Sequence, residues 1–125
     1  MTLLLDTQIF LWYLADSKRL VPRARTAISG ADRVFVSAAS IWEAAIKTAL
    51  GKLTVVLDDL VAGIAASGFS ELPITALHAA RVAALPDHHR DPFDRMLIAQ
   101  ALHEPLHLLT ADAALRRYSE LIVTV

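Results

Sequence analysis

The sequence predicts an α/β fold in which a mainly parallel sheet lies between two layers of helices. Short apolar segments typical of strands recur along the chain, and stretches with apolar residues at helical spacing separate them. This alternation is typical of parallel sheets, whose strands are connected by helices. With 125 residues, of which 55% are hydrophobic, the chain is expected to form a single domain over residues 1–125.

Four segments are predicted to be strands. Each is a short run dominated by leucine, valine and isoleucine, and polar or turn-forming residues lie next to it. Their ranges are 2–5, 33–37, 106–110 and 121–125.

Helices are predicted between these strands. The first begins near Thr7, and the second follows Pro22, which suits the first position of a helix. A third covers residues 40–53, where an apolar stripe that includes Trp42 ends near Gly51, a plausible C-terminal stop. The remaining helical ranges are 58–67, 75–85 and 93–103.

The composition excludes several classes of protein. A formal net charge of -1 argues against a broad nucleic-acid-binding face, which usually has a basic footprint. No apolar run approaches the roughly 20 residues that are needed to cross a bilayer. The absence of cysteine excludes disulfides and thiolate metal sites, and it fits a cytoplasmic protein. Any site for a polyanion is therefore expected to be local or to use a metal ion.

Four acidic residues are predicted to lie where a parallel sheet collects its ligands, beyond the carboxyl ends of the strands. Asp6 directly follows the first strand, and Asp112 follows the strand at 106–110. Glu43 and Asp94 lie near the starts of two helices. All four side chains are therefore expected at one edge of the sheet.

Each acid also suits a structural role at a helix start. Asp6 is a candidate N-cap, and Ser40 with Glu43 has the form of a capping box. Asp91 can cap the helix that begins after it, and Asp112 can cap the segment AALRRY. Taken singly, each acid is therefore better explained by local structure than by catalysis.

The acids as a set point to metal chemistry. Four carboxylates gathered at one edge would repel one another unless cations neutralised them. Carboxylate oxygens are ligands that suit Mg²⁺ or Mn²⁺. Such ions activate water and stabilise the in-line transition state of phosphodiester cleavage. The set therefore predicts a metal-dependent phosphodiesterase.

Four segments resemble a PIN domain of the VapC toxin type, the ribonuclease half of toxin–antitoxin pairs. They are LLLDT at 3–7, SAASIWEAAIK at 37–47, HHRDPFDRMLIAQA at 88–101 and LLTAD at 108–112. The resemblance covers essentially the whole chain and implies a PIN-like three-layer α/β/α sandwich. It also implies a Mg²⁺- or Mn²⁺-dependent endoribonuclease that acts on RNA, forms a homodimer and is neutralised by a cognate antitoxin.

The resemblance also implies a set of site residues. The acidic cluster of the family falls on Asp6, Glu43 and Asp94, with Asp112 as the fourth catalytic and metal-binding residue. Asp91 belongs to the same motif as Asp94, and we assign it mainly to capping and loop geometry.

Several neighbouring residues are predicted to support the site. Thr7 is expected to bind a metal-bound water or Asp6, or to act only as a local cap. Arg90 and Arg95 are candidates for contact with RNA phosphate, with a solvated surface position as the alternative. Lys47 lies one turn after the acid of the third helix, where an ordinary i,i+4 ion pair is expected.

The histidines and tryptophans are assigned to structural positions. His88 and His89 are expected in a loop near the rim of the pocket, because adjacent loop residues seldom aim at one metal. Trp12 and Trp42 lie on apolar helical faces, where packing in the core or in a dimer is favoured over base stacking.

Three other functions share parts of this pattern. Haloacid-dehalogenase phosphatases also begin with a strand that ends in Asp, but Gln8 stands where they need a second acid. A receiver-type phosphoacceptor module needs an acid beside Asp6 and a late lysine, and no lysine follows Asp112. A noncatalytic PIN-like domain that binds RNA or protein stays open, because the acids indicate a capacity for metal rather than turnover.

Overall fold

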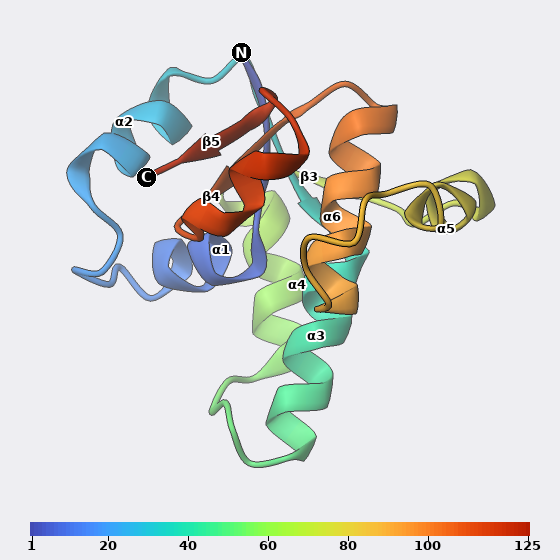
Figure 1. Ribbon diagram of the computed structural model, residues 1–125. Coiled ribbons are helices and arrows are strands. Elements are labelled where there is room, and N and C mark those ends of the chain that lie inside the picture. The colour runs from blue at the N-terminus through green and yellow to red at the C-terminus, as the bar shows by residue number, and fades with distance from the viewer.

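The computed structural model describes residues 1–125 and has three layers, with helices on both faces of a central sheet (Figure 1). The sheet contains five parallel strands in the order β3-β2-β1-β4-β5. The strands are β1 (Thr2–Leu5), β2 (Arg33–Ser37), β3 (Ser70–Leu72), β4 (His107–Thr110) and β5 (Ile122–Thr124). The predicted fold class is confirmed.

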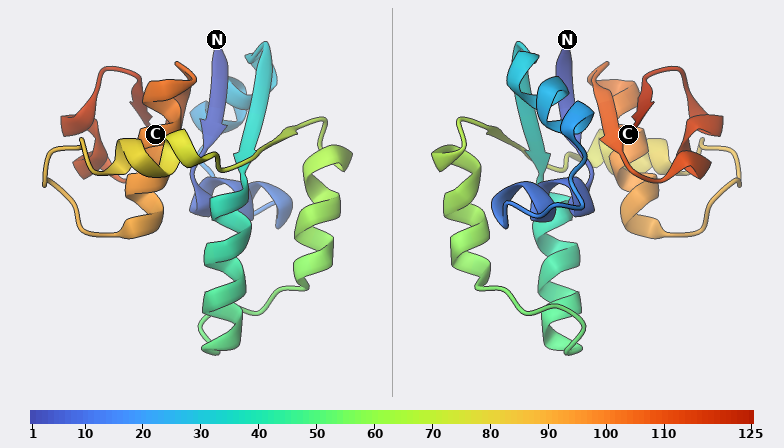
Figure 2. Two further views of the ribbon diagram at one scale, coloured as in Figure 1. Left: turned by 90° about the vertical axis from the view of Figure 1, so that its right-hand side faces the viewer. Right: turned by 90° about the vertical axis from the view of Figure 1, so that its left-hand side faces the viewer.

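Six α-helices and one 3₁₀ helix connect the strands. They are α1 (Thr7–Leu14), α2 (Pro22–Gly30), α3 (Ala38–Ala49), α4 (Leu57–Ala66), α5 (Ala76–Val82), α6 (Pro92–His103) and η1 (Ala113–Tyr118). Helices α3 and α4 lie side by side and extend beyond the sheet, as both views of Figure 2 show. None of the helices is both long and apolar enough to cross a membrane.

The central strand β1 separates two apolar cores. Leu3 and Leu5 pack in the core that contains residues of α1, α2 and α4, whereas Leu4 packs in the core formed with α6. All three side chains are completely buried. A central strand of a parallel sheet is covered on both faces, which explains why this segment is a continuous leucine run rather than an alternating pattern.

The strand β3 is absent from the predicted elements. It consists of three residues at the edge of the sheet, where Ser70 pairs with Phe35 and Leu72 pairs with Ser37. Only Leu72 among the three is fully buried. Its apolar pattern is therefore too short to distinguish it from a loop, and its position is determined by pairing with β2.

Helix α3 begins two residues earlier than predicted. Its N-cap is Ser37, whose hydroxyl oxygen accepts the N–H of Ala39. Ser40 lies inside the helix and accepts a hydrogen bond from the hydroxyl of Thr7. The predicted capping box of Ser40 and Glu43 is therefore wrong, because the last residue of β2 already caps the helix.

The apolar stripe of α3 faces solvent. The exposed fractions are 59% for Trp42 and 37% for Ile46, Ala49 is exposed, and Leu50, the C-cap that follows α3, is 64% exposed. The ring of Trp42 packs edge to face against Phe93 of α6 at a centroid distance of 5.1 Å. Core packing of Trp42 is therefore wrong as a prediction, since the buried face of α3 instead carries small residues and Glu43.

Gly51 ends α3 in the way the sequence predicts. Its φ of 73° lies in the left-handed region. The N–H of Gly51 donates to the carbonyl of Thr48, and the N–H of Lys52 donates to the carbonyl of Lys47 at 2.8 Å. These two bonds form a Schellman motif, which satisfies carbonyls that the end of the helix would leave free.

We predict that Gly51→Ala lowers the free energy of unfolding by about 1 kcal/mol, because a side chain disfavours positive φ. Urea denaturation measures the change. Gly30→Ala is the matched control, since Gly30 lies in α2 and an added Cβ would meet no atom within 4 Å. The control should leave stability unchanged or slightly raise it. Equal losses in the two variants would contradict the role assigned to the left-handed turn.

Candidate functional site

A cleft of about 450 Å³ lies at the carboxyl edge of the sheet. Its walls come from the ends of β1 and β4, from α3 and from the start of α6. Most of its lining is polar, and the charged residues are Asp6, Glu43, Asp91, Asp94, Asp112, Lys47 and Lys52. The structure therefore brings all five predicted acids to one cleft.

Asp6 is fixed through both oxygens of its carboxylate. Oδ1 accepts the N–H of Ile9 at 2.8 Å, which makes Asp6 the N-cap of α1. Oδ2 accepts the hydroxyl of Thr110, the last residue of β4, at 2.5 Å. The capping role is confirmed, and the same side chain lines the cleft. Its orientation is therefore set before any ligand arrives.

The ionised form of Asp6 is unfavourable in this environment. Burial raises its pKa from the ordinary 3.8 to about 6, and repulsion from Asp94 and Glu43 adds to the effect. The hydrogen bonds to Asp6 oppose this rise without cancelling it. Below pH 3.8 Asp6 is mainly protonated in both the native and the unfolded state, so it has little effect on stability. Above pH 6 it is ionised in both states, and burial of the charge lowers the free energy of unfolding by about 3 kcal/mol.

Glu43 is buried, with 6% of its surface exposed. Its Oε2 pairs with Nζ of Lys47 at 2.7 Å, which confirms the expected i,i+4 ion pair and raises the pKa of Lys47. Its Oε1 is buried without a hydrogen-bond partner. A carboxylate oxygen without a partner is costly in a buried site, so this atom is suited to binding a cation.

The start of α6 supplies two further acids. Oδ1 of Asp91 accepts the N–H groups of Phe93 and Asp94 at 2.9 and 3.0 Å, which confirms its capping role. Oδ2 of Asp94 lies 2.9 Å from Nε2 of His89. Burial raises the pKa of Asp94, and the hydrogen bond from His89 opposes the rise. Asp94 is therefore free of capping and is oriented by the preceding loop.

Asp112 occupies the outer part of the cleft. Its Oδ1 accepts the N–H of Ala114 at 3.0 Å, so it caps the 3₁₀ helix η1 as the sequence predicts. Its own N–H donates to the hydroxyl of Thr110, which in turn donates to Asp6. Thr110 thus connects the turn that carries Asp112 to the buried acid.

The donor set of the cleft fits a hard divalent cation. The tightest group is His89, Asp94 and Asp112, whose ligand atoms all lie within 4.8 Å of one another. Asp6 and Glu43 lie outside this group, but both repel Asp94 electrostatically. One oxygen of Glu43 has no partner, and burial raises the pKa of both Asp6 and Asp94, so a bound cation would relieve an unfavourable feature of each acid. Carboxylate oxygens in such a site favour Mg²⁺ or Mn²⁺.

The hydroxyl of Thr7 does not bind Asp6, which was one of the alternatives expected for it. Thr7 lines the cleft, but it donates to Oγ of Ser40 at 2.9 Å. The predicted bond to Asp6 is therefore wrong. Thr110 binds Asp6 instead, because the end of β4 lies beside the end of β1.

Arg90 and Arg95 lie outside the lining of the cleft. Arg90 is exposed. The guanidinium of Arg95 donates to the backbone carbonyls of Val82, Pro86 and His89 at 3.2, 3.0 and 3.2 Å. Arg95 therefore holds the loop before α6, and phosphate contact by either arginine stays a prediction.

Three residues that line the cleft or bind its acids are missing from the predicted site residues. Lys52 follows the glycine stop of α3, and Thr110 ends the predicted strand at 106–110. His89 lies five residues before Asp94 in the most specific of the recognised segments. The signal for each was proximity to an end of a helix or strand, but only the folded chain shows which of these ends meet.

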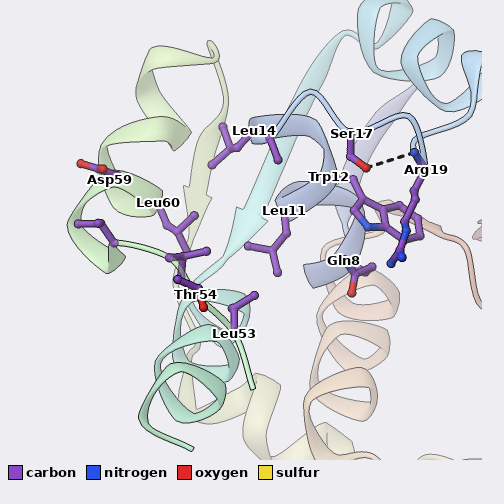
Figure 3. A pocket seen from close by; sticks show the side chains of 13 residues that line it. Gln8, Leu11, Trp12, Leu14, Ser17, Arg19, Leu53, Thr54, Asp59 and Leu60 are labelled. Atoms are coloured by element: carbon purple, nitrogen blue, oxygen red, sulfur yellow. Dashed lines mark hydrogen bonds between the residues drawn. The ribbon is translucent and has the colours of Figure 1, made fainter. Parts of the chain in front are cut away.

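A larger cavity of about 640 Å³, shown in Figure 3, shares part of its lining with the acidic cleft. It lies between α1 and the segment that leads into α4, and most of its lining is apolar. Gln8, Leu11 and Leu53 line both spaces. Its charged residues are Arg19 and Asp59. An extended ligand in this cavity would therefore have a continuous path to the acids.

Comparison with known proteins gives consistent results. The model of the PIN domain family matches residues 3–121. Ribonuclease VapC22 of Mycobacterium tuberculosis is 34% identical over 125 residues, covering 94% of this chain and 92% of that protein.

Two solved structures have a similar fold. One is VapBC2 from Rickettsia felis, bound to a DNA fragment from its promoter. Its matching chain has a TM-score of 0.70 at 12% identity and covers 100% of this chain and 98% of that one. The other is a toxin-antitoxin complex from Klebsiella pneumoniae, with a TM-score of 0.67 at 21% identity and coverage of 97% and 95%.

We predict that Asp6→Asn stabilises the metal-free protein by about 1 to 3 kcal/mol at pH 7.5, because it removes a buried charge and keeps an N-cap acceptor. The gain should shrink as the pH falls through 6 and become small near pH 4, where Asp6 is protonated in the native state and partly protonated in the unfolded chain. Urea denaturation in EDTA from pH 4 to 8 measures it. Asp87→Asn, at an exposed loop position, is the control and should show no such trend. A pH-independent effect of Asp6→Asn would contradict the raised pKa.

Proposed function

The chain belongs to the PIN domain family, and we propose that it is a metal-dependent endoribonuclease that acts as the toxin of a toxin–antitoxin pair. The observation that carries the proposal is the cleft lined by five acids, where one buried oxygen of Glu43 has no partner and burial makes Asp6 costly to ionise. The relative named Ribonuclease VapC22 supports the reaction type. A cytoplasmic location, where RNA is available, is part of the same proposal.

The carboxylates of the cleft would hold one or two Mg²⁺ or Mn²⁺ ions. Asp94 and Asp112 belong to the group of close donor atoms, and Asp6 and Glu43 line the same cleft. When bound, such ions activate water and stabilise charge on the attacked phosphate, so no covalent enzyme intermediate is needed. Bound metal ions would offset the negative charge of the acids and attract phosphate. A chain with net charge -1 would then bind a polyanion at this site.

The protein's own contribution is to hold the carboxylates in place. Asp6 is fixed by the N–H of Ile9 and the hydroxyl of Thr110, and Asp94 is fixed by His89. These groups are oriented by strand ends and by a helix start, which are rigid parts of the fold. The acids therefore need little rearrangement when charge develops on the substrate.

The acids explain cleavage of the phosphodiester backbone but not a choice of sequence. They act on groups that every nucleotide shares. Specificity would come from the shape of the RNA and from accessible single-stranded loops. Thr7 and Asp91, which also line the cleft, are proposed as supporting residues at its floor and at the start of α6.

The proposed antitoxin binds through the apolar cavity and extends toward the acids. This placement rests on the residues shared by the two spaces and on the similarity of the fold to chains in toxin-antitoxin complexes. A segment with apolar side chains followed by a basic one would match the apolar lining and then the carboxylates. Occupation of the cleft would exclude RNA.

The proposed homodimer buries the exposed stripe of α3. Trp42, Ile46 and Leu50 recur at four-residue spacing along one helix face, and Phe93 packs beside Trp42. An exposed row of large apolar side chains is typical of an interface. This is the dimer alternative that the sequence offered for Trp42.

We predict that the purified chain cleaves labelled structured RNA with Mg²⁺ or Mn²⁺ and that EDTA abolishes cleavage. Asp94→Asn should reduce the rate by at least about 100-fold, because it removes a ligand charge without removing a helix cap. Glu43→Gln should do the same, since Glu43 does not cap α3. Gel analysis of the products measures the rates.

The same assay separates the enzyme from the noncatalytic alternative. A folded wild type that binds Mn²⁺ and RNA but cuts no RNA would favour a binding domain. Normal cleavage by Asp94→Asn would contradict the assigned site. Circular dichroism of each variant excludes misfolding as the cause of a lost rate.

We predict that Val56→Glu weakens binding of the antitoxin by about tenfold, because Val56 lines the apolar cavity and is 62% exposed. Val61→Glu is the control, since Val61 is 48% exposed and lies outside that cavity. The toxin and antitoxin are coexpressed and then separated, and titration of the antitoxin into each toxin variant measures the affinity. RNA cleavage should be unchanged in both variants, and equal losses of affinity would contradict the placement.

A further inference from the structure

The acidic cleft also contains lysine side chains, for which the proposed metal chemistry gives no role. The chain contains three lysines, Lys18, Lys47 and Lys52. Lys47 and Lys52 line the cleft, whereas no arginine does. The only positive side chains at the reaction site are therefore two lysines from the end of α3 and the turn after it.

The end of α3 determines where Lys52 lies. The Schellman motif turns the chain at Gly51, and the N–H of Lys52 completes it by donating to the carbonyl of Lys47. The following residue, Leu53, lines the cleft as well. Lys52 forms no salt bridge with any acid of the protein. Its ammonium group is therefore available to an anion from outside.

Lys47 is only partly used by its ion pair. Its ammonium has three N–H donors, and Glu43 accepts at one atom, Oε2. The side chain of Lys47 is 48% exposed, although that of Glu43 is only 8% exposed. Asp91 and Asp94 also act electrostatically on Lys47, which places its charge close to the start of α6. Lys47 thus connects the buried acid to the open part of the cleft.

An RNA backbone entering this cleft would meet five carboxylates. Metal ions can neutralise those that bind them, but the phosphates beside the reacting one need other partners. Lysine provides compact, mobile positive charge that pairs with phosphate without selecting a base. Two lysines on one side of the cleft meet this need.

We propose that Lys47 and Lys52 bind RNA phosphates and hold the backbone in the acidic cleft. The inference rests on the proposed ribonuclease function and assigns the substrate contacts within that same site. Lys47 has a second role through its ion pair with Glu43, whereas Lys52 acts on the substrate alone. Neither lysine selects a sequence.

The test is the salt dependence of RNA binding. Fluorescence anisotropy of a labelled single-stranded oligoribonucleotide gives the binding constant in Ca²⁺ over a series of NaCl concentrations, with gels to verify intact RNA. Each phosphate contact to a single strand contributes about 0.7 to the slope of log K against log salt concentration. Lys47→Gln and Lys52→Gln should each reduce the slope by about this amount, equally for oligoribonucleotides of unrelated sequence.

Two further variants control the measurement. Lys18→Gln removes the one lysine outside the cleft and should leave the slope unchanged. Lys47→Arg keeps the charge and should retain the slope. Thermal unfolding of every variant separates loss of the Glu43 ion pair, which lowers stability, from loss of a phosphate contact, which does not.

The outcomes distinguish this inference from the function on which it rests. If the wild type cleaves RNA with Mg²⁺ and both glutamine variants keep the wild-type slope, the lysine contacts are wrong and the ribonuclease stands. If the wild type neither binds nor cleaves RNA, both proposals fail. If Lys18→Gln reduces the slope as much as the two cleft variants do, RNA binding depends on charge anywhere on the surface rather than on the two cleft lysines. That result would also overturn the inference.

Discussion

Parallel pairing of the strands is the constraint on which the rest of this structure depends. Because all five strands run in one direction, their carboxyl ends meet at one edge, and the helices that follow begin there. The positive ends of those helices favour acidic residues as caps. Asp6, Asp91 and Asp112 cap α1, α6 and η1, and all three acids line one cleft. Local rules of helix capping thus assemble a cluster of acids before any ligand is considered.

The cluster is held in place against its own repulsion. Asp6 and Glu43 are among the most buried charged groups of the chain. Burial raises the pKa of Asp6, and one oxygen of Glu43 has no partner although the other pairs with Lys47. Two apolar cores on the faces of the sheet provide the stability that this arrangement lowers. Buried groups that lower the stability of the protein are typical of functional sites, where the requirements of function and of stability differ. Binding of a cation would relieve the disagreement and favour the native state.

The sequence contained most of the fold, the identities of the acids and their local contacts, namely the helix caps and the ion pair with Lys47, but not their contacts with distant parts of the chain. The leucine run at residues 3–5 and the stop at Gly51 are strong local signals, and both elements formed as predicted. Edge strand β3 has no comparable signal, because its position depends on pairing with β2. The partner of Thr7 depends on how α1 packs against α3, and the partner of Asp6 depends on a residue 104 positions away. Such contacts are products of tertiary packing, which periodicity and capping rules do not encode.

The contacts of Arg95 change how mutations in this region should be understood. One guanidinium gathers carbonyls from a loop that also presents His89 and leads into Asp91. The side chain lies outside the cleft, but the position of groups inside the cleft depends on it. Loss of the Arg95 side chain would free the carbonyls that hold this loop, including that of His89, without removing any side chain from the lining of the cleft. Distance from the chemistry is therefore a poor guide to sensitivity in this protein, since the loop transmits a backbone change directly to the site.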